Sequence, residues 1–331
     1  MKAAYIERTG PPENIVFGDL PKPLPRGSEV LVKVAAVAVN PVDTYVRSGM
    51  IAWDVPKPFI VGCDLAGVVE EVGPAARLLR PGDRVWGTNQ GLLGRQGTFA
   101  EYCAVDESWL YPIPEGVSEE TAAACALVGV TAHLGLFRDA RIRAGETIFV
   151  QGGTGGVGSM VIQMAKAAGA RVMATGGSDE KVRRCRELGA DRAVNYKTED
   201  VSQAVREFAP QGVNVFWETR RDPDFDNIVA CLAERGRIVL MAGREARPPF
   251  PVGPFYVKGC AMYGFAMFKA SAAELRAAAD EINCWLAEGK LQAQIVRRLP
   301  LSQTAAAHRL QEENTLRNAG TLAGKIVLRP D

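Results

Sequence analysis

The chain has 331 residues, about twice the size of a usual domain, so two domains are expected. Hydrophobic residues make up 47% and charged residues 23%, which is typical of a folded globular protein and argues against extensive disorder. The 39 Lys and Arg residues balance the 38 Asp and Glu residues, and a net charge of +1 provides no global field for nucleic acid or an anionic membrane. We therefore expect neither as a partner.

No membrane span or secretory signal is predicted. The apolar stretch from Val30 to Val39 is interrupted by Lys33 and is far shorter than the roughly 20 residues that a spanning helix needs. The residues from Met1 to Arg8 lack the apolar stretch and the small-residue cleavage site of a signal peptide. We therefore expect a cytoplasmic protein.

Seven cysteines are scattered singly, without a CxxC pair. This arrangement argues against a disulfide framework and a structural zinc cluster, and we expect most of these thiols to be reduced and buried. They are Cys63, Cys103, Cys125, Cys185, Cys231, Cys260 and Cys284.

From Met1 to about Pro114, Gly and Pro separate short segments that favour β-strands. These are Lys2–Ile6, Glu29–Ala38, Leu65–Val72, Asp83–Gly87 and Phe99–Val105. From about Glu119 to Ala270, apolar strands alternate with helical stretches, which predicts βαβ units and a parallel sheet. The strands are Thr147–Val150, Arg171–Thr175, Val213–Trp217 and Arg237–Met241.

The last part of the chain returns to mixed elements. It contains an amphipathic stretch, a β-like segment, a helix and a final strand, at Ala272–Leu286, Gln294–Leu301, Thr304–Glu313 and Lys325–Arg329 respectively. We expect this part to join the N-terminal domain.

The strongest functional signal is a glycine-rich turn between the strand Thr147–Val150 and the helical stretch Ser159–Ala168. Gly153, Gly155 and Gly158 match the pattern GxGxxG. Glycine at these positions permits a tight turn, close approach of the backbone to a pyrophosphate, and close packing of helix on strand. The pyrophosphate then lies at the helix N-terminus. A glycine-rich turn without a ligand is the alternative.

The end of the strand Arg171–Thr175 indicates which dinucleotide binds, because NAD-binding folds place an acid there for the ribose 2′-hydroxyl. Two glycines and Ser178 follow instead, and Lys181 is the first cation positioned to meet a 2′-phosphate. We therefore expect NADP. Two alternatives stay open: Asp179 or Glu180 bends back toward the ribose, or Lys181 is a solvated lysine on a helix face.

Five motifs occur in an order that resembles a known family. They are Asn40–Gly49, Gly62–Gly67, Gly82–Val85, Gly97–Tyr102 and the turn Gly152–Gly158. Together they resemble the zinc-independent quinone oxidoreductase (ζ-crystallin-like) branch of the medium-chain dehydrogenase/reductase superfamily, over essentially the whole chain. The resemblance implies an α/β protein with a GroES-like β-rich catalytic domain (1–120 and 269–331) and a Rossmann domain (121–268), a doubly wound parallel sheet that binds NADP.

Zinc-dependent relatives hold a catalytic metal with a cysteine before the first helix, a His-Glu pair and a further cysteine. Here the first position falls within Asn40–Asp43, and Cys63 and Asp64 replace the pair. The two histidines, His133 and His308, lie in helical stretches, where packing or surface roles are expected. We therefore expect no metal, and without that Lewis acid the reduction of an electrophilic acceptor is favoured over alcohol oxidation.

The resemblance also implies contacts with the cofactor. The pyrophosphate is expected to contact Thr154, Gly155, Gly156 and Val157. The adenosine end is expected to contact Gly177, Ser178, Lys181 and Tyr196. The nicotinamide half is expected to contact Thr131, Ala242, Gly243, Arg244, Phe265 and Met267. Core or interface packing is the alternative for Phe265 and Met267. Lys325 is expected to reach the phosphates from the last strand.

Family members often dimerise by joining sheet edges, through the strand that is Cys260–Met267 here. We therefore expect a homodimer.

In the substrate loop, relatives tend to carry tyrosine where Ile51 and Phe59 stand, so two hydroxyl donors are absent. Trp53 offers a surface for stacking a planar acceptor, or is an ordinary tryptophan without that role.

Asn40, Asp43 and Tyr45 lie in the segment that faces the nicotinamide in relatives. We expect them to bind the acceptor oxygen or relay a proton, although Asp43 as N-cap of a helix over Tyr45–Arg47 is an alternative. The expected activity is NADPH-dependent hydride transfer to a small-molecule quinone or enone, without zinc. Two alternatives are an enoyl or alkenal reductase, which protonates carbon after hydride addition, and a non-catalytic NADPH-binding protein.

Overall fold

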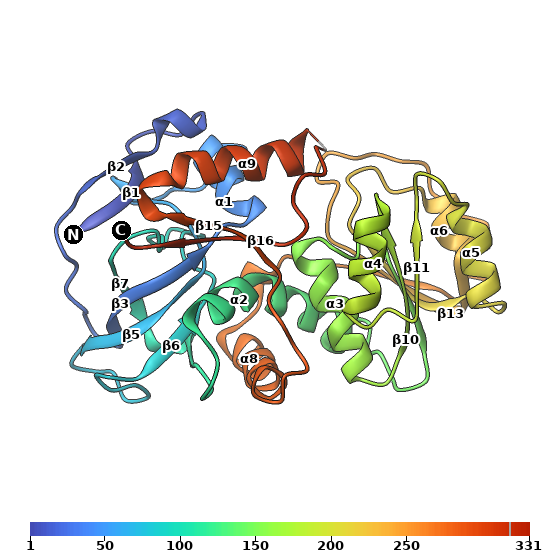
Figure 1. Ribbon diagram of the computed structural model, residues 1–331, viewed down its shortest axis with the longest axis horizontal. Coiled ribbons are helices and arrows are strands. Elements are labelled where there is room, and N and C mark those ends of the chain that lie inside the picture. The colour runs from blue at the N-terminus through green and yellow to red at the C-terminus, as the bar shows by residue number, and fades with distance from the viewer. Residues whose placement is uncertain (318) are drawn as a thin grey trace. The chain divides into compact units, whose positions relative to one another are not determined.

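The computed structural model describes residues 1–317 and 319–331, and it divides into two compact units (Figure 1). Unit 1 consists of Met1–Val130 and Ala270–Asp331, and unit 2 of Thr131–Lys269. The first boundary falls at Val130/Thr131, ten residues after the expected 120/121, and helix α2 (Glu119–His133) spans both positions.

Unit 1 is built on two sheets. The small sheet has the order β2-β1-β4, with β1 at Lys2–Ile6, β2 at Val16–Asp19 and β4 at Phe59–Ile60. The larger sheet has the order β15-β16-β3-β5-β6-β8, and β7 also pairs with β3. Its strands are β3 (Glu29–Ala38), β5 (Leu65–Val72), β6 (Arg84–Gly87), β7 (Tyr102–Asp106), β8 (Leu110–Pro112), β15 (Ile295–Pro300) and β16 (Lys325–Arg329).

The C-terminal strand completes the larger sheet. Strand β16 pairs in parallel with β15 and antiparallel with β3, where Val327 lies opposite Ala38. The helices of this unit, besides most of α2, are α1 (Pro41–Ser48), α8 (Ala272–Ala287) and α9 (Thr304–Leu316). Figure 1 shows α9 running beside α1, and the two helices contact each other.

Helix α1 begins earlier than expected. Asn40 is its N-cap and Pro41, with φ already fixed for a helix, is its first residue. Asp43 occupies the third helical position, where its Oδ2 accepts the backbone N–H of Asn40 at 2.8 Å. The alternative in which Asp43 caps a helix over Tyr45–Arg47 is therefore wrong, because the chain turns into the helix three residues before Asp43.

Unit 2 contains a six-stranded parallel sheet in the order β11-β10-β9-β12-β13-β14. The strands are β9 (Thr147–Val150), β10 (Arg171–Gly176), β11 (Arg192–Asn195), β12 (Val213–Glu218), β13 (Leu232–Leu240) and β14 (Ala261–Gly264). This is the 3-2-1-4-5-6 order of the doubly wound Rossmann fold, and the predicted fold class is confirmed.

Five helices connect these strands: α3 (Gly156–Ala167), α4 (Asp179–Glu187), α5 (Val201–Phe208), α6 (Phe225–Cys231) and α7 (Val252–Val257). The strands bury Val, Ile and Phe side chains, and the rings of Phe149 and Phe216 lie 4.7 Å apart in the core. Because all six strands run in parallel, their carboxyl ends, with the loops that follow, share one edge of the sheet.

One helical stretch of the described residues, Glu119–Asp139, is long and apolar enough to cross a membrane. Most of it is buried inside the protein, as in a core helix, so its composition is weak evidence for a span. Its end, Leu134–Asp139, is a π-helix.

All seven cysteines are free thiols and five are buried, as expected.

Candidate functional site

The glycine-rich turn lies between β9 and α3, at the carboxyl edge of the parallel sheet. The backbone N–H groups of Gly152 and Gly153 donate to the Oγ1 and the carbonyl oxygen of Thr175, at 3.0 and 2.9 Å. On the other side, Thr219 Oγ1 donates to the carbonyl oxygen of Gln151 at 2.7 Å. The ends of β10 and β12 therefore hold the turn from both sides.

Glycine occupies the three motif positions for different physical reasons. A Cβ on Gly158 would lie 2.2 Å from the carbonyl oxygen of Gly152, and a Cβ on Gly153 would lie 2.8 Å from Cys185 Sγ. A Cβ on Gly155 would meet only Gly152 O, at 3.4 Å, and Gly155 has a φ of −67° that any residue adopts. The fold needs the first two glycines, whereas glycine at position 155 leaves room for a ligand at the N-terminus of α3.

The predicted adenosine-end residues lie where β10 and β11 end. Ser178 is the N-cap of α4, and its Oγ accepts the N–H of Lys181 at 3.3 Å. Tyr196 is half exposed, and its hydroxyl lies above Gly177, where an added Cβ would be 2.5 Å away. The structure thus brings all four predicted residues to one corner.

Lys197, which the sequence analysis did not single out, adds a second cation to this corner. Burial lowers the pKa of Lys181, and repulsion by the Lys197 ammonium lowers it further. Two ammonium groups that repel each other favour binding of an anion between them. Of the two rival carboxylates, Asp179 accepts Asn195 Nδ2–H on its Oδ1 at 2.9 Å, at the end of β11, and the charge of Glu180 raises the pKa of Lys181.

The residues expected at the nicotinamide half are less uniform. Gly243 has a left-handed φ of 79° in the loop after β13, and a Cβ there would lie 2.5 Å from Arg221 O. Its neighbours are half-buried Ala242 and exposed Arg244. Phe265 and Met267 follow β14: the guanidinium of Arg138 lies over the ring of Phe265, and Met267 is buried. Thr131 is buried in α2.

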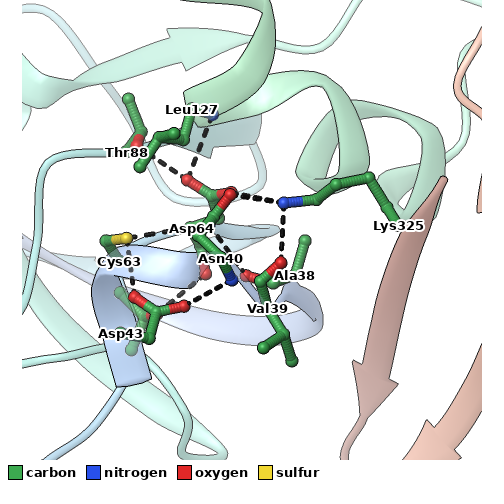
Figure 2. A network of polar contacts seen from close by, with 10 residues as sticks. Ala38, Val39, Asn40, Asp43, Cys63, Asp64, Thr88, Leu127 and Lys325 are labelled. Atoms are coloured by element: carbon green, nitrogen blue, oxygen red, sulfur yellow. Dashed lines mark hydrogen bonds and ion pairs between the residues drawn. The ribbon is translucent and has the colours of Figure 1, made fainter. Parts of the chain in front are cut away.

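A second polar cluster lies in unit 1 and is shown in Figure 2. We call it the Lys325 network; its members are Asn40, Asp43, Cys63, Asp64, Thr88 and Lys325, all buried. They come from the start of α1, the loop between β4 and β5, the end of β6, and β16.

Asp64 is the centre of the Lys325 network. Its Oδ1 accepts Thr88 Oγ1–H at 2.7 Å and the backbone N–H of Leu127 at 3.2 Å. Its Oδ2 accepts Asn40 Nδ2–H at 2.7 Å and lies 3.8 Å from Lys325 Nζ. The Lys325 ammonium also donates to Asn40 Oδ1 and, at 2.8 Å, to the carbonyl oxygen of Val39.

Asp43 and Cys63 form the other end of the network, where the thiol donates to Asp43 Oδ1 at 2.8 Å. Burial raises the pKa of Asp43 to about 7, the Cys63 hydrogen bond opposes the rise, and the Asp64 charge adds to it. Burial likewise raises the pKa of Cys63 well above its ordinary value, and the charge of Asp43 raises it further. Cys63 is therefore a neutral thiol at pH 7.

The four residues predicted for the acceptor fall into two groups. Asn40 is fully buried, and both its amide atoms bond within the network; Asp43 accepts a hydrogen bond on each oxygen. Tyr45 and Trp53 are only partly buried. Direct contact with an acceptor therefore fits Tyr45 and Trp53, whereas Asn40 and Asp43 fit a supporting position.

Sequence reasoning missed several residues of the two clusters. Cys63 and Asp64 were noted as replacing metal ligands but received no role, although the motif Gly62–Gly67 pointed to them. Thr88, Thr175 and Thr219 carry no local signal, because their importance depends on which strand ends lie side by side.

Comparison with known proteins agrees with this architecture. Residues 26–115 match the model of the alcohol dehydrogenase GroES-like domain, and residues 156–283 match that of the zinc-binding dehydrogenase. The rat quinone oxidoreductase is 30% identical over 330 residues, covering 99% of this chain and 97% of the relative. The chloroplastic NADPH-dependent alkenal/one oxidoreductase of Arabidopsis thaliana is 39% identical over 228 residues, covering 67% and 57%.

Solved structures are similar over the whole chain. An NAD-dependent alcohol dehydrogenase has a TM-score of 0.90 and 32% identity, covering 100% of both chains. The Escherichia coli quinone oxidoreductase complexed with NADPH has a TM-score of 0.86 and 25% identity, also covering 100% of both. The relatives agree with the motifs, the sheet order and the glycine-rich turn. This chain therefore belongs to the quinone oxidoreductase branch of the medium-chain dehydrogenase/reductase superfamily, and it is an oxidoreductase.

Proposed function

We propose that the protein uses NADPH to reduce a quinone or a related conjugated carbonyl, without zinc. The observation that carries the proposal is the corner at the carboxyl ends of β10 and β11, next to the strand that leads into the glycine-rich turn, where the charge of Lys197 acts on Lys181. Such a corner fits an additional phosphate better than a bare ribose hydroxyl. The E. coli relative with bound NADPH supports the same cofactor.

The residues of this chain supply binding and orientation. The turn from Thr154 to Val157 would hold the pyrophosphate, and Gly177, Lys181 and Tyr196 the phosphorylated ribose. When bound, NADPH supplies a hydride. On the acceptor side, half-buried Tyr45 offers a hydroxyl that can hydrogen-bond to a carbonyl oxygen, and Trp53 an aromatic surface for a planar ring.

The groups at the positions of the zinc ligands of relatives do not fit a catalytic metal. The Cys63 thiol donates to Asp43, and the two amide atoms of Asn40 bond to Asp64 and Lys325. The Lys325 ammonium already stands beside Asp64. Within residues 1–317 and 319–331, there is no group of three or more His, Cys, Asp or Glu side chains arranged to hold a metal ion. These observations support reduction without a Lewis acid.

The test is oxidation of NADPH, side by side with NADH, against 1,4-benzoquinone, 9,10-phenanthrenequinone and a simple alkenal. Turnover that prefers NADPH and a quinone supports the proposal. The Arabidopsis alkenal/one oxidoreductase gives a second candidate, and formation of a saturated carbonyl product from the alkenal would favour it. Tight NADPH binding without turnover of any acceptor would favour a non-catalytic role.

The Lys181 and Lys197 pair predicts cofactor selectivity. In each of the Lys181→Ala and Lys197→Ala variants, we expect the ratio of kcat/KM for NADPH to that for NADH to fall at least about tenfold, since a hydrogen bond to a charged group contributes about 1.5 to 3 kcal/mol. Arg183→Ala, on an exposed side chain of the same helix, is the control. An unchanged ratio in both lysine variants would refute the assignment.

For assembly, we propose a homodimer formed through β14, the edge strand of the parallel sheet. Apolar side chains are exposed on β14 and the nearby α7, namely Met262, Val252, Tyr256 and Val257. An exposed apolar edge is a common dimer contact. A monomer mass by light scattering would contradict the proposal.

We further propose a cytoplasmic location, with no nucleic-acid or membrane partner.

A further inference from the structure

Lys325 has an unusual environment for a lysine. It lies on β16 with only 5% of its surface exposed, and its ammonium bonds to Val39 and Asn40 near the start of α1. Fully buried lysines are rare unless they are paired. The sequence resemblance placed this ammonium at the cofactor phosphates, but its bonds point into the catalytic domain.

Titratable groups from several elements act on the ammonium. Asp64 and Cys63 come from the loop between β4 and β5, Asp43 from α1, and Cys125 from α2. Burial lowers the pKa of Lys325, and all four groups oppose this change. A buried ion of this kind is tolerated only where opposite charge and hydrogen bonds compensate its desolvation.

The arrangement around Asn40 gives the charge a geometric role. The Asn40 amide oxygen accepts from Lys325, while its Nδ2 donates to Asp64. The amide can satisfy both partners in one orientation only. Because Asn40 is the N-cap of α1 and its N–H bonds to Asp43, this orientation fixes the first turn of the helix that carries Tyr45.

We propose that Lys325 is a positioning residue for the acceptor: its ammonium acts as a fixed internal cation that neutralises Asp64 and locks Asn40, and thereby the start of α1. This inference rests on the proposed function, in which Tyr45 contacts the acceptor. It assigns Lys325 to the acceptor side, so loss of the ammonium harms acceptor turnover and leaves NADPH binding intact.

The experiment uses Lys325→Met, Asp64→Asn and the double variant. The control is Arg329→Met, on the same strand with an exposed side chain that pairs with Glu120. We would measure NADPH binding by fluorescence titration, kcat and KM for the best acceptor, and thermal unfolding. For Lys325→Met we expect kcat/KM for the acceptor to fall about 10- to 100-fold, because small misplacements have effects of this size. The NADPH Kd should stay within about twofold.

The double variant tests the cause. Removing the Asp64 charge together with Lys325 removes the carboxylate that the ammonium compensates, so we expect the double variant to recover about fivefold or more of the loss in Lys325→Met. If Lys325→Met does not fold, recovery of folding in the double variant is the expected result. Arg329→Met should behave as the wild type.

Three outcomes would overturn the inference. One is unchanged acceptor kinetics in Lys325→Met. Another is a rise of about tenfold or more in the NADPH Kd, which would indicate that Lys325 contacts the cofactor phosphates. The third is strict additivity of the Lys325 and Asp64 losses. If the wild type reduces no acceptor, the proposed function fails, while the unfolding measurements on the same four proteins still decide whether Lys325 and Asp64 are coupled.

Discussion

Lowering the pH from 7.5 to 5 is expected to reduce the free energy of unfolding by about 2 kcal/mol through His308. This side chain is fully buried on α9, where burial and then the charge of Arg47 lower its pKa from 6.5 to about 3. The stability contribution is present above pH 6.5, the unfolded value, and is lost as the pH falls toward 3. At pH 5 the ring is neutral in the folded chain but protonated in the unfolded chain.

The measurement is denaturant unfolding of the wild type and His308→Leu at both pH values. Leucine is close in size, and the two ring nitrogens have no hydrogen-bond partner, so the exchange should cost little at pH 7.5. The raised pKa of Asp43 acts in the opposite direction, because its contribution is lost as the pH rises through about 7. Asp43 is common to both proteins and cancels in the comparison. If the free energy of unfolding changed equally in the wild type and in His308→Leu between pH 7.5 and pH 5, the role of His308 would be refuted.

Gly155→Ala is expected to weaken NADPH binding at least about tenfold while changing the melting temperature by less than about 2 °C. The new methyl group meets only the carbonyl oxygen of Gly152, at 3.4 Å, and the backbone suits alanine. It stands, however, at the N-terminus of α3, where the pyrophosphate has to approach. Fluorescence titration with NADPH and thermal unfolding measure the two effects separately.

Two further glycines complete this experiment. Gly158→Ala should lower both stability and affinity, since its Cβ would lie 2.2 Å from a backbone oxygen. Gly253→Ala, on α7 with no atom within 4 Å of the new Cβ, should change neither. Wild-type NADPH affinity in Gly155→Ala would show that the cofactor does not lie on this turn.

Much of the fold was predictable because its strands have clear local patterns. The bounds of β1, β3, β5, β9 and β16 match the predicted segments. Strand β13 was predicted as Arg237–Met241 but extends over Leu232–Leu240. Its start contains the exposed residues Glu234 and Arg235, and the strand begins earlier because Leu232 pairs with Val213 of β12, before an irregularity in the register.

The two parts of the candidate site differed in how far sequence could predict them. The glycine-rich turn is contiguous, so its spacing carries the signal. The Lys325 network is not contiguous, because Lys325 and Asn40 lie 285 positions apart in the chain. Their meeting depends on the register in which β16 pairs with β3, and no local pattern encodes that register.

The pairing of β16 with β3 also has a consequence for biosynthesis. Unit 2 is one continuous segment, so all its strands can pair as soon as they leave the ribosome. Unit 1 cannot complete its larger sheet until β16 has been made, and the end of β3, at Val37 and Ala38, lacks this partner during the synthesis of the entire Rossmann sheet. Until then, Asp64 has no ammonium beside it. The nascent N-terminal segment therefore has an incomplete sheet during most of the synthesis of this chain, a state that favours misfolding and aggregation.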